Sequence, residues 1–353
     1  MNKRRLGYTL LTVLMILSVI FVSLPASVNA AAKFKIPASL TITNKSVYKF
    51  DLNGYAPKSI KWSSSDKSIV FVTKKGKLTA KTPGKAIITA TIDGKKYTCK
   101  IKVKTLRIAH RGYSSVYPEK TIEAFKGAVK NGFDGIECDI WESKNGDLMI
   151  SHDPTVKRTT GKNKYIWQIN KSNRAKYPII HANGIKNYKG KKLLIPTMQE
   201  TAKFIAKYKC RLMLHIKTKG SLGYKLSSGG IKKIIKIIKK YKITSKTTIF
   251  TRNKTILSKF FGSKIKLGAI TTPDSKLNLK QDFKWCMLNK VDNLVILSVD
   301  NFKKFYSVKQ VKKLSDKYSV DFGIYTTNTF KEFEAIQNYG ALFSMSDYYL
   351  DKA

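Results

Sequence analysis

Hydrophobic and polar residues alternate along residues 37–104, and turn-forming residues interrupt the alternation every few positions. A period of two is the pattern of β-strands with one buried face, and it predicts strands over 60–66, 69–72, 86–92 and 97–103. The last two strands are joined by Asp93-Gly94, a dipeptide typical of tight hairpins. We therefore expect a small all-β domain over 37–104.

From Leu106 onward the pattern changes, and short apolar runs alternate with segments of helical periodicity. Such alternation is typical of a parallel sheet whose strands are joined by helices. Helical periodicity is found over 119–130, 198–208, 230–241 and 330–339. The apolar strand candidates lie near 107–111, 135–141, 212–217, 247–251, 267–271, 294–298, 321–326 and 342–346. Eight strands predict an α/β fold, a (β/α)₈ TIM barrel over 106–353, whose chemistry is expected at the carboxyl ends of the strands.

Residues 1–30 have the order of a secretory signal peptide. Three basic residues precede an apolar run over 6–24, and Pro25 and the small-residue site Val28-Asn29-Ala30 follow it. An uncleaved N-terminal anchor is the alternative, because the apolar run approaches the length that spans a bilayer. No other stretch of the sequence is long and apolar enough to cross a membrane. We expect a mature protein that is secreted or associated with the cell wall, with no stable membrane span after cleavage.

The chain carries 68 Lys and Arg residues against 22 Asp and Glu, a formal net charge of +46. Hydrophobic residues still make up 42 %, which excludes a disordered polycation. Only eight of the basic residues are Arg, the side chain preferred for reading bases and phosphates, so nucleic acid is not the expected partner. A field carried by Lys suits anionic polymers, and those of a cell wall are the partner we expect besides a substrate.

The four cysteines, Cys99, Cys138, Cys210 and Cys286, are widely spaced and show no metal-site spacing. Each falls in an apolar strand or helix pattern, so we expect buried thiols and no disulfide framework. The candidate chemistry lies in other side chains.

Polar side chains are concentrated at the predicted strand ends of the barrel. Glu137 and Asp139 are two residues apart on the second strand, so both carboxylates project to one face, the barrel lumen. Two bare carboxylates there would be costly without a cation, and hard oxygen ligands indicate Ca²⁺, Mg²⁺ or Mn²⁺. His215 closes the third strand.

Two further histidines, His110 and His152, follow the first strand and a short segment after the second. Flanking a metal, they could act as general base and general acid at near-neutral pH. Arg111 and Lys217 would hold an anionic phosphate for attack. These residue types in these places predict cleavage of a phosphodiester.

The all-β segment resembles the bacterial Ig-like (group 2) domain. The resemblance is carried by Trp62-Ser63-Ser64-Ser65 and by Gly84, Ala86, Ile88 and Ala90 in the core strand. It implies a β-sandwich that serves as a spacer or adhesion module and has no chemistry of its own.

Residues 106–350 resemble glycerophosphodiester phosphodiesterases, most strongly in the first half. The resemblance is carried by Ala109-His110-Arg111-Gly112, Pro118-Glu119-Lys120-Thr121, Gly135-Ile136-Glu137-Cys138-Asp139, His152-Asp153 and Ile195-Pro196-Thr197-Met198-Gln199-Glu200. It implies a barrel enzyme that cleaves glycerophosphodiesters with the help of a divalent metal, Ca²⁺ or Mg²⁺.

The same resemblance implies the following roles for individual residues. The acid/base pair would be His110 and His152, and the phosphate contacts would be Arg111 and Lys217. The metal ligands would be Glu137 and Asp139. Glu119 would hold the His-Arg-Gly loop in shape.

Four positions depart from the family pattern. The family has a third carboxylate ligand on the third strand, where this chain has His215; we predict His215 as the third metal ligand, which would favour Mn²⁺ or Zn²⁺ over Ca²⁺. The Asn of the P-E-N-T motif is replaced by Lys120, and the Trp of the W-T-V-N motif by Tyr325. The terminal T-D-x-P motif is only loosely kept in Ser346-Asp347-Tyr348.

We expect an exported, metal-dependent phosphodiesterase that hydrolyses glycerophosphodiesters to glycerol 3-phosphate and an alcohol by two-His acid/base catalysis. His215 and the weak match near the C-terminus motivate an alternative, a weakly active or inactive wall-associated binding protein that uses the Ig-like domain and the basic surface. A barrel lipase acting on phosphoinositides or sphingolipids is a third reading, disfavoured by the lack of an evident interfacial aromatic loop.

Overall fold

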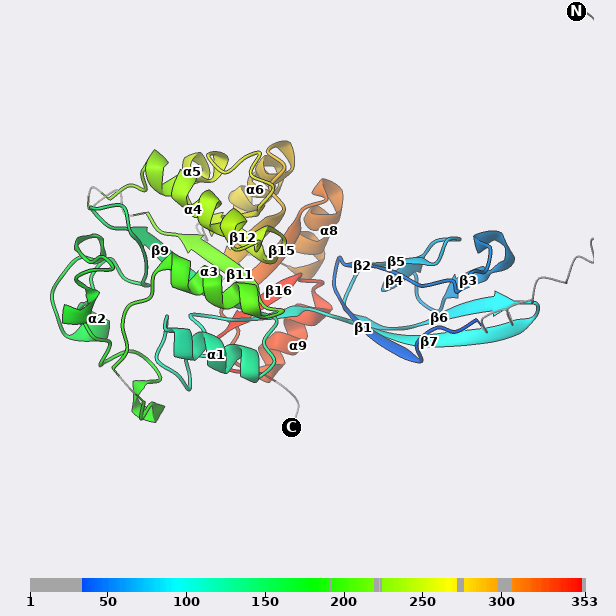
Figure 1. The fold of residues 1–353 in the computed structure, drawn as a ribbon. Coiled ribbons are helices and arrows are strands. Elements are labelled where there is room, and N and C mark those ends of the chain that lie inside the picture. Colours follow the sequence, from blue (N-terminus) through cyan, green and yellow to red (C-terminus); the bar gives the residue numbers. More distant parts are fainter. Residues whose placement is uncertain are drawn as a thin grey trace, which may run out of the picture.

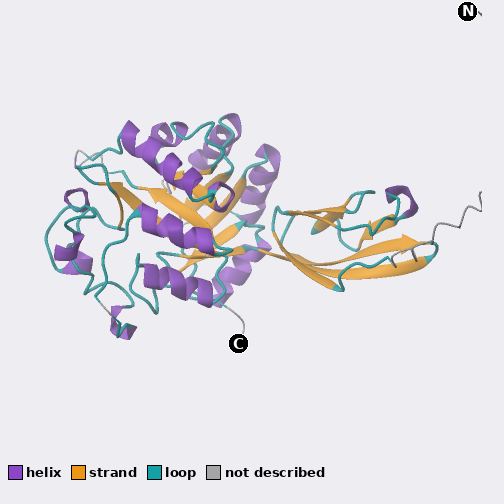
Figure 2. Cartoon of the chain, viewed as in Figure 1, coloured by secondary structure: helices purple, strands orange, loops and turns teal. Residues whose placement is uncertain are grey.

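The computed structural model describes residues 34–190, 192–218, 222, 224–271, 276–297 and 307–350 of the 353-residue chain. The predicted signal peptide lies outside the described residues. Within them the chain forms an N-terminal all-β body and a larger body in which helices surround a sheet (Figure 1, Figure 2).

Two sheets build the N-terminal body. The first has the strand order β1-β7-β6-β3 and the second the order β2-β5-β4. The bounds are β1 Ser39–Thr43, β2 Val47–Lys49, β3 Lys61–Ser64, β4 Val70–Val72, β5 Lys77–Ala80, β6 Gly84–Ile92 and β7 Lys95–Lys104. Leu78 and Ile88, one from each sheet, are fully buried in the core that the sheets share. Asp93 and Gly94 join β6 to β7 with positive φ angles of 47° and 77°, which is the geometry of the predicted tight hairpin.

Eight parallel strands close into a barrel in the larger body, which confirms the predicted fold. The ring order is β8-β9-β11-β12-β13-β14-β15-β16, and β8 pairs with both β9 and β16. The bounds are β8 Leu106–Ala109, β9 Gly135–Glu142, β11 Arg211–Ile216, β12 Thr247–Thr251, β13 Lys266–Ile270, β14 Asn293–Leu297, β15 Asp321–Tyr325 and β16 Phe343–Ser346. The short strand β10 (Leu148–Ile150) lies outside this ring and pairs antiparallel with β9.

Helices cover the outside of the barrel (Figure 2). Their bounds are α1 Ile122–Lys130, α2 Lys157–Thr160, α3 Met198–Lys207, α4 Ser228–Lys240, α5 Lys254–Ser258, α6 Lys276–Leu288, α8 Val308–Tyr318 and α9 Phe330–Asn338. The helix predicted from residue 119 begins later because Thr121 caps it: the Oγ1 of Thr121 accepts a hydrogen bond of 3.1 Å from the N–H of Ala124. Glu119 and Lys120 therefore lie in the loop before α1.

Two apolar layers stabilise the barrel. Ile108, Phe250 and Val295 belong to a cluster that fills the space inside the ring, and a larger cluster lies between the strands and the helices. All four cysteines are buried and free, as predicted. None of the helices in the described part of the chain has the length and apolar character needed to cross a membrane.

The β-body contacts the barrel at the amino ends of the barrel strands. The Nδ2 of Asn44 donates to the carbonyl of Gly340 at 3.0 Å, and the Oγ1 of Thr105 donates to the carbonyl of Ala341 at 2.9 Å, just before β16 begins. The carboxyl ends of the ring strands lie at the opposite end of the barrel, away from the β-body (Figure 1). The face on which such barrels carry their chemistry is therefore left clear of it.

Candidate active site

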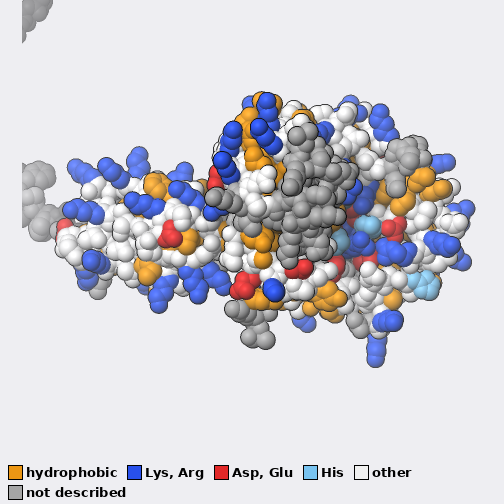
Figure 3. Space-filling view, turned by 180° about the vertical axis from the view of Figure 1, so that it is seen from behind, with side chains coloured by type: hydrophobic (Ala, Val, Ile, Leu, Met, Phe, Trp, Pro, Cys, Tyr) orange, Lys and Arg blue, Asp and Glu red, His pale blue; other side chains and the backbone are white. Residues whose placement is uncertain are grey.

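The predicted site residues lie on neighbouring elements of the barrel. Glu137 and Asp139 lie on β9, and His215 lies on β11. The carboxyl ends of β8, β10 and β11 are followed closely by His110, His152 and Lys217, in this order. His152 comes close because β10 runs back along β9, and the N–H of Ser151 donates to the carbonyl of Asp139 at 3.2 Å. Figure 3 shows His and acidic side chains gathered on one face of the barrel, whereas Lys and Arg are spread over both bodies.

Asp139 lies at the centre of a buried charged cluster. The residue is 1 % exposed, and its Oδ1 accepts a hydrogen bond of 2.8 Å from the Nδ1 of His215 and lies 3.0 Å from the Nζ of Lys217. Burial alone would raise the pKa of Asp139, but the positive charges of Lys120 and Lys217 outweigh it and hold this pKa well below its usual range. Burial lowers the pKa of His215. The hydrogen bond to Asp139 acts to raise this pKa, and the positive charge of Lys217 acts with burial to lower it. At neutral pH the cluster therefore holds an ionised Asp139 beside a neutral His215.

Lys120 places its ammonium group between the two carboxylates of β9. The Nζ of Lys120 lies 2.8 Å from the Oε2 of Glu137. It also forms an ion pair of 2.5 Å with the Oδ2 of Asp139, an oxygen that has no hydrogen-bond partner in the described part of the chain. The residue is 3 % exposed. Burial alone would lower the pKa of Lys120, but Asp139 and Glu137 outweigh it and raise this pKa, so the side chain is charged.

His110 is held by a carboxylate from the far end of the chain. The Nδ1 of His110 lies 2.9 Å from the Oδ1 of Asp347, which also accepts a hydrogen bond of 2.9 Å from the Oγ of Ser114. The other oxygen, Oδ2, accepts a hydrogen bond of 3.0 Å from the Nδ2 of Asn328. Burial alone would raise the pKa of Asp347, but the bond to His110 and these further donors lower it. An ionised carboxylate only accepts, so Nδ1 carries the proton and Nε2 of the neutral ring has the free lone pair.

His152 has the same type of partner within its own loop. Its Nδ1 lies 2.7 Å from the Oδ1 of Asp153, and the Nε of Arg158 donates to the Oδ2 of Asp153 at 2.6 Å. Burial opposes the ionised form, but the bonds from His152 and Arg158 lower the pKa of Asp153 to about 2. Both histidines are thus oriented so that Nε2 can accept or donate a proton.

Glu119 joins the loops that carry the two histidines. It is 1 % exposed and accepts two hydrogen bonds from Arg158, at 3.0 and 2.7 Å. The NH1 of Arg111, next to His110, lies 3.2 Å from the same carboxylate. A continuous chain of charged contacts therefore runs from the first histidine loop to the second.

The turn after His110 requires a glycine. Gly112 has a φ of +79°, and a Cβ built on it would lie 2.7 Å from the Cβ of Ala124 on α1. The preceding Arg111 also has a positive φ, 61°, and its backbone N–H donates to the Oε2 of Glu137 at 3.0 Å. The close approach of this turn to α1 places His110 and Arg111 over the carboxylates of β9.

Glu137, Asp139 and His215 each offer a ligand atom, and these atoms lie within 4.8 Å of one another. Two carboxylates and an imidazole are donors of the right type for a divalent ion. The contacts within the cluster nevertheless do not fit one, because the Lys120 ammonium lies against both carboxylates. His215 donates its Nδ1–H to Asp139, so only its Nε2 could ligate an ion. A dication bound to these oxygens would lie within a few ångströms of a buried positive charge.

The sequence-based prediction gives no role to Lys120, Asp153 or Asp347, each of which contacts a predicted site residue. Asp153 stands next to His152, and Asp347 directly follows the last barrel strand, so the placement of chemistry at strand ends could have identified both. Lys120 lies in a loop, where no periodicity indicates the direction of its side chain.

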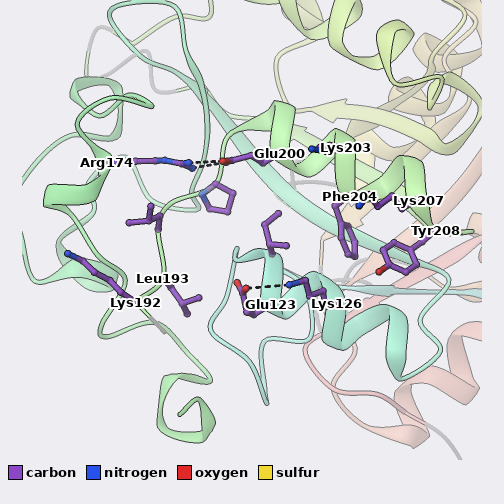
Figure 4. A pocket seen from close by; sticks show the side chains of 13 residues that line it. Glu123, Lys126, Arg174, Lys192, Leu193, Glu200, Lys203, Phe204, Lys207 and Tyr208 are labelled. Carbon is purple, nitrogen blue, oxygen red and sulfur yellow. Dashed lines mark hydrogen bonds and ion pairs between the residues drawn. The ribbon is translucent and has the colours of Figure 1, made fainter. Parts of the chain in front are cut away.

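A separate pocket lies on the outside of the barrel, between α1, α3 and the 192–196 segment (Figure 4). Arg174 pairs with Glu200 at 2.6 Å along its wall, and Lys126 lies 3.7 Å from Glu123. None of the predicted site residues lines this pocket. It is therefore distinct from the cluster at the strand ends.

Two known families match the chain. The glycerophosphoryl diester phosphodiesterase family matches residues 110–315, and the bacterial Ig-like domain (group 2) matches residues 27–101. These matches confirm both resemblances seen in the motifs.

Curated relatives match part of the barrel. A glycerophosphodiester phosphodiesterase of Caldanaerobacter subterraneus subsp. tengcongensis is 36 % identical over 154 residues, 43 % of this chain and 59 % of the relative. One of Bacillus altitudinis is 30 % identical over 118 residues, 32 % of this chain and 45 % of the relative. The chain thus spans about half the length of these curated relatives.

Solved structures share the fold. A phosphodiesterase of Oleispira antarctica in complex with the product sn-glycerol-3-phosphate aligns with a TM-score of 0.58 at 21 % identity, covering 69 % of this chain and 93 % of that one. A glycerophosphodiester phosphodiesterase from Thermotoga maritima aligns with a TM-score of 0.55 at 21 % identity, covering 69 % and 95 %. At such identities the likeness shows the barrel fold alone.

Proposed function

The chain belongs to the glycerophosphoryl diester phosphodiesterase family, and we propose that it hydrolyses glycerophosphodiesters to glycerol 3-phosphate and an alcohol. The observation that carries this proposal is the pair of histidines, His110 and His152, each with a carboxylate on Nδ1. His110 stands next to Arg111, and the carboxylate of His152 also binds Arg158. Relatives named as glycerophosphodiester phosphodiesterases, and a structural neighbour that holds sn-glycerol-3-phosphate, support the substrate class.

In the proposed mechanism, positive charge at the strand ends binds the phosphate and stabilises the charge that develops on it. Arg111 follows β8 and Lys217 follows β11, the two strands that flank β9. Arg111 contacts Glu137 through its backbone, and Lys217 pairs with Asp139. Preorganised cations act most strongly where water is excluded, as it is around these buried carboxylates.

The two histidines transfer the protons. One accepts the proton of the attacking hydroxyl, from water or from the 2-hydroxyl of the substrate, as its oxygen bonds to phosphorus. The other donates a proton to the leaving alkoxide as the phosphorus–oxygen bond to the alcohol breaks. If the 2-hydroxyl attacks, a cyclic phosphate forms and water then opens it, so both routes consume one water and end at glycerol 3-phosphate and an alcohol. His110 and His152 supply these functions in either order.

No step of this mechanism passes through a metal ion. The sequence predicts one, Ca²⁺ or Mg²⁺ by resemblance and Mn²⁺ or Zn²⁺ because of His215. The contacts of Lys120 with Glu137 and Asp139 argue against an ion in that place.

The activity is tested by measuring release of glycerol 3-phosphate from glycerophosphocholine. We expect His110→Ala and His152→Ala to abolish release, because each removes one proton-transfer group. His181→Ala is the matched control, since His181 is exposed, lies outside the cluster and should leave the rate unchanged. Turnover by either site variant at the rate of the unchanged protein would overturn the assignment, and absence of release by the unchanged protein from a panel of glycerophosphodiesters would favour the binding-protein alternative.

We also propose that the protein is exported and retained by anionic polymers of a cell wall. The motivation is the signal-like order of residues 1–30 together with the full chain's net charge of +46. Figure 3 shows Lys and Arg side chains on both bodies. Retention on purified anionic wall polymer should fall as salt rises from about 0.05 to 0.5 M, because screening shortens the reach of surface charges. Retention that does not change with salt, or no retention, would contradict an electrostatic partner of this kind.

A further inference from the structure

We propose that Lys120 takes the place of a divalent ion in this site, so that the site binds no such ion and works without one. The catalytic half of this inference rests on the proposed phosphodiesterase function. The binding half, that no divalent ion enters the Glu137–Asp139 cluster, stands on the geometry alone.

The first support is the position of the ammonium group. The Nζ of Lys120 lies 2.8 Å from Glu137 and 2.5 Å from Asp139, so one cation bridges the two carboxylates that would otherwise share a metal. The oxygens have further donors as well: the Oε2 of Glu137 accepts from the backbone of Arg111, and the Oδ1 of Asp139 contacts His215 and Lys217. The carboxylates are thus compensated by groups of the protein itself.

The second support is the charge. Two of the departures from the family pattern meet in this cluster: His215 replaces a carboxylate, and Lys120 replaces a neutral Asn. In formal charge, a histidine in place of a carboxylate residue removes one negative charge, and a lysine in place of an asparagine adds one positive charge. Together they supply two positive charges, the same charge that a divalent ion would bring. A site with both replacements and a dication would carry an excess of buried positive charge, which is costly.

The third support is that Lys120 is locked in place. It is 3 % exposed, its N–H donates to the carbonyl of Arg111 at 2.9 Å, and the next residue, Thr121, caps α1. Its φ of 59° is in the left-handed region, where Asn is favoured over Lys, so the backbone itself does not explain a lysine here. The ion pairs with Glu137 and Asp139 do explain it.

This replacement changes the chemistry that the site can use. An ammonium group balances charge and donates hydrogen bonds, but it cannot coordinate a water molecule and lower its pKa as a metal can. Activation of the nucleophile therefore falls to His110 and His152 alone. Lys120 acts as a positioning residue, which fixes the carboxylates and adds positive potential beside the phosphate.

The binding half is tested on the full chain by thermal unfolding and elemental analysis. After treatment with a chelator, the unchanged protein should carry no stoichiometric Ca, Mg, Mn or Zn, and its Tm should move by less than about 1 °C when each ion is added at millimolar concentration. A saturable rise of more than about 3 °C with any of these ions, abolished by Glu137→Gln, would overturn the proposal. This readout needs no activity, so it decides the question even if the proposed function fails.

The catalytic half uses the same chelated protein. Release of glycerol 3-phosphate should stay within about twofold of the untreated rate, and added ions should not raise it. A loss of more than about tenfold on chelation, restored by one ion, would show that the family's metal is used after all. If no sample releases product, the proposed function has failed, and the ion titration still reports on the site.

A double variant tests the charge argument directly. Lys120→Asn with His215→Glu restores the family pattern, and we expect it to gain the ion-dependent rise in Tm that the unchanged protein lacks, and to need the ion for activity. Lys104→Asn is the matched control, because it removes a part-buried lysine that pairs with Asp134 at 2.6 Å on the other end of the barrel, and it should gain no ion binding. A folded double variant that binds no ion while the unchanged protein does would reverse the inference.

Discussion

Asp347 is the residue whose replacement most sharply tests the proposed histidine pair. It accepts hydrogen bonds of 2.9 Å from His110, 2.9 Å from Ser114 and 3.0 Å from Asn328. Asp347→Asn keeps the shape but removes the charge that stabilises the imidazolium of His110 when it takes a proton. A hydrogen bond to a charged group contributes about 1.5–3 kcal/mol, which corresponds to a fall in kcat of about 10- to 150-fold. The amide can also turn its NH₂ toward Nδ1 and impose the wrong tautomer, which would add to the loss.

The assay is steady-state release of glycerol 3-phosphate, with kcat and KM measured separately. The loss should fall on kcat, since the imidazolium exists only along the reaction path, and KM should change little. Asp282→Asn is the matched control: it removes a buried carboxylate that pairs with Lys254 at 2.7 Å on an outer helix, and kcat should stay unchanged. A folded Asp347→Asn protein with kcat within about twofold of the unchanged protein would refute the assignment of His110 as a proton-transfer group.

Two further predictions concern stability. The pKa of Asp153 is lowered to about 2 from 3.8, so its ionised form stabilises the fold above about pH 4 and this contribution is lost as pH falls toward 2. Asp153→Asn should therefore lower the free energy of unfolding by about 1–2 kcal/mol at pH 7. The difference in unfolding free energy between the variant and the unchanged protein should shrink between pH 4 and 2. If denaturant titrations give a constant difference over that range, the ionisation of Asp153 does not stabilise the fold. Gly112→Ala should destabilise the fold by about 1–3 kcal/mol and lower kcat, because the added Cβ would lie 2.7 Å from the Cβ of Ala124. Gly146→Ala, at the same φ of +79° but with open space around it, should retain full activity. Equal effects of the two changes on kcat would rule out a special requirement for glycine at the His110 turn.

The sequence predicts the barrel well because its signals are local and periodic. All eight ring strands fall within a few residues of the apolar runs, since a buried strand needs an unbroken apolar segment wherever it lies in the ring. The helix expected from residue 119 begins at Ile122 instead, because the cap of Thr121 is a stronger local signal than the apolar pattern before it. The hairpin at Asp93-Gly94 is likewise set by two residues alone.

In the candidate site, too, some features follow from local sequence and others only from the tertiary structure. The spacing of Glu137 and Asp139 already places both carboxylates on one face of a strand, and the motifs around His110 and His152 already indicate a phosphodiesterase. The partners of these groups come from the tertiary structure. His110 and Asp347 are 237 residues apart and meet only because β8 and β16 close the ring.

The sequence by itself therefore determined the fold and the family, since each follows from local pattern or motif, and it predicted the groups that we propose to carry the chemistry. Only the tertiary structure decided how their charges are balanced. The sequence marked Lys120 as an unusual residue in a familiar motif and pointed to a metal nearby, yet its ammonium lies between the carboxylates. The direction of a loop side chain depends on the backbone angles of its turn and on charged residues of other strands that lie nearby in the fold. The periodicity of the sequence predicts neither of these.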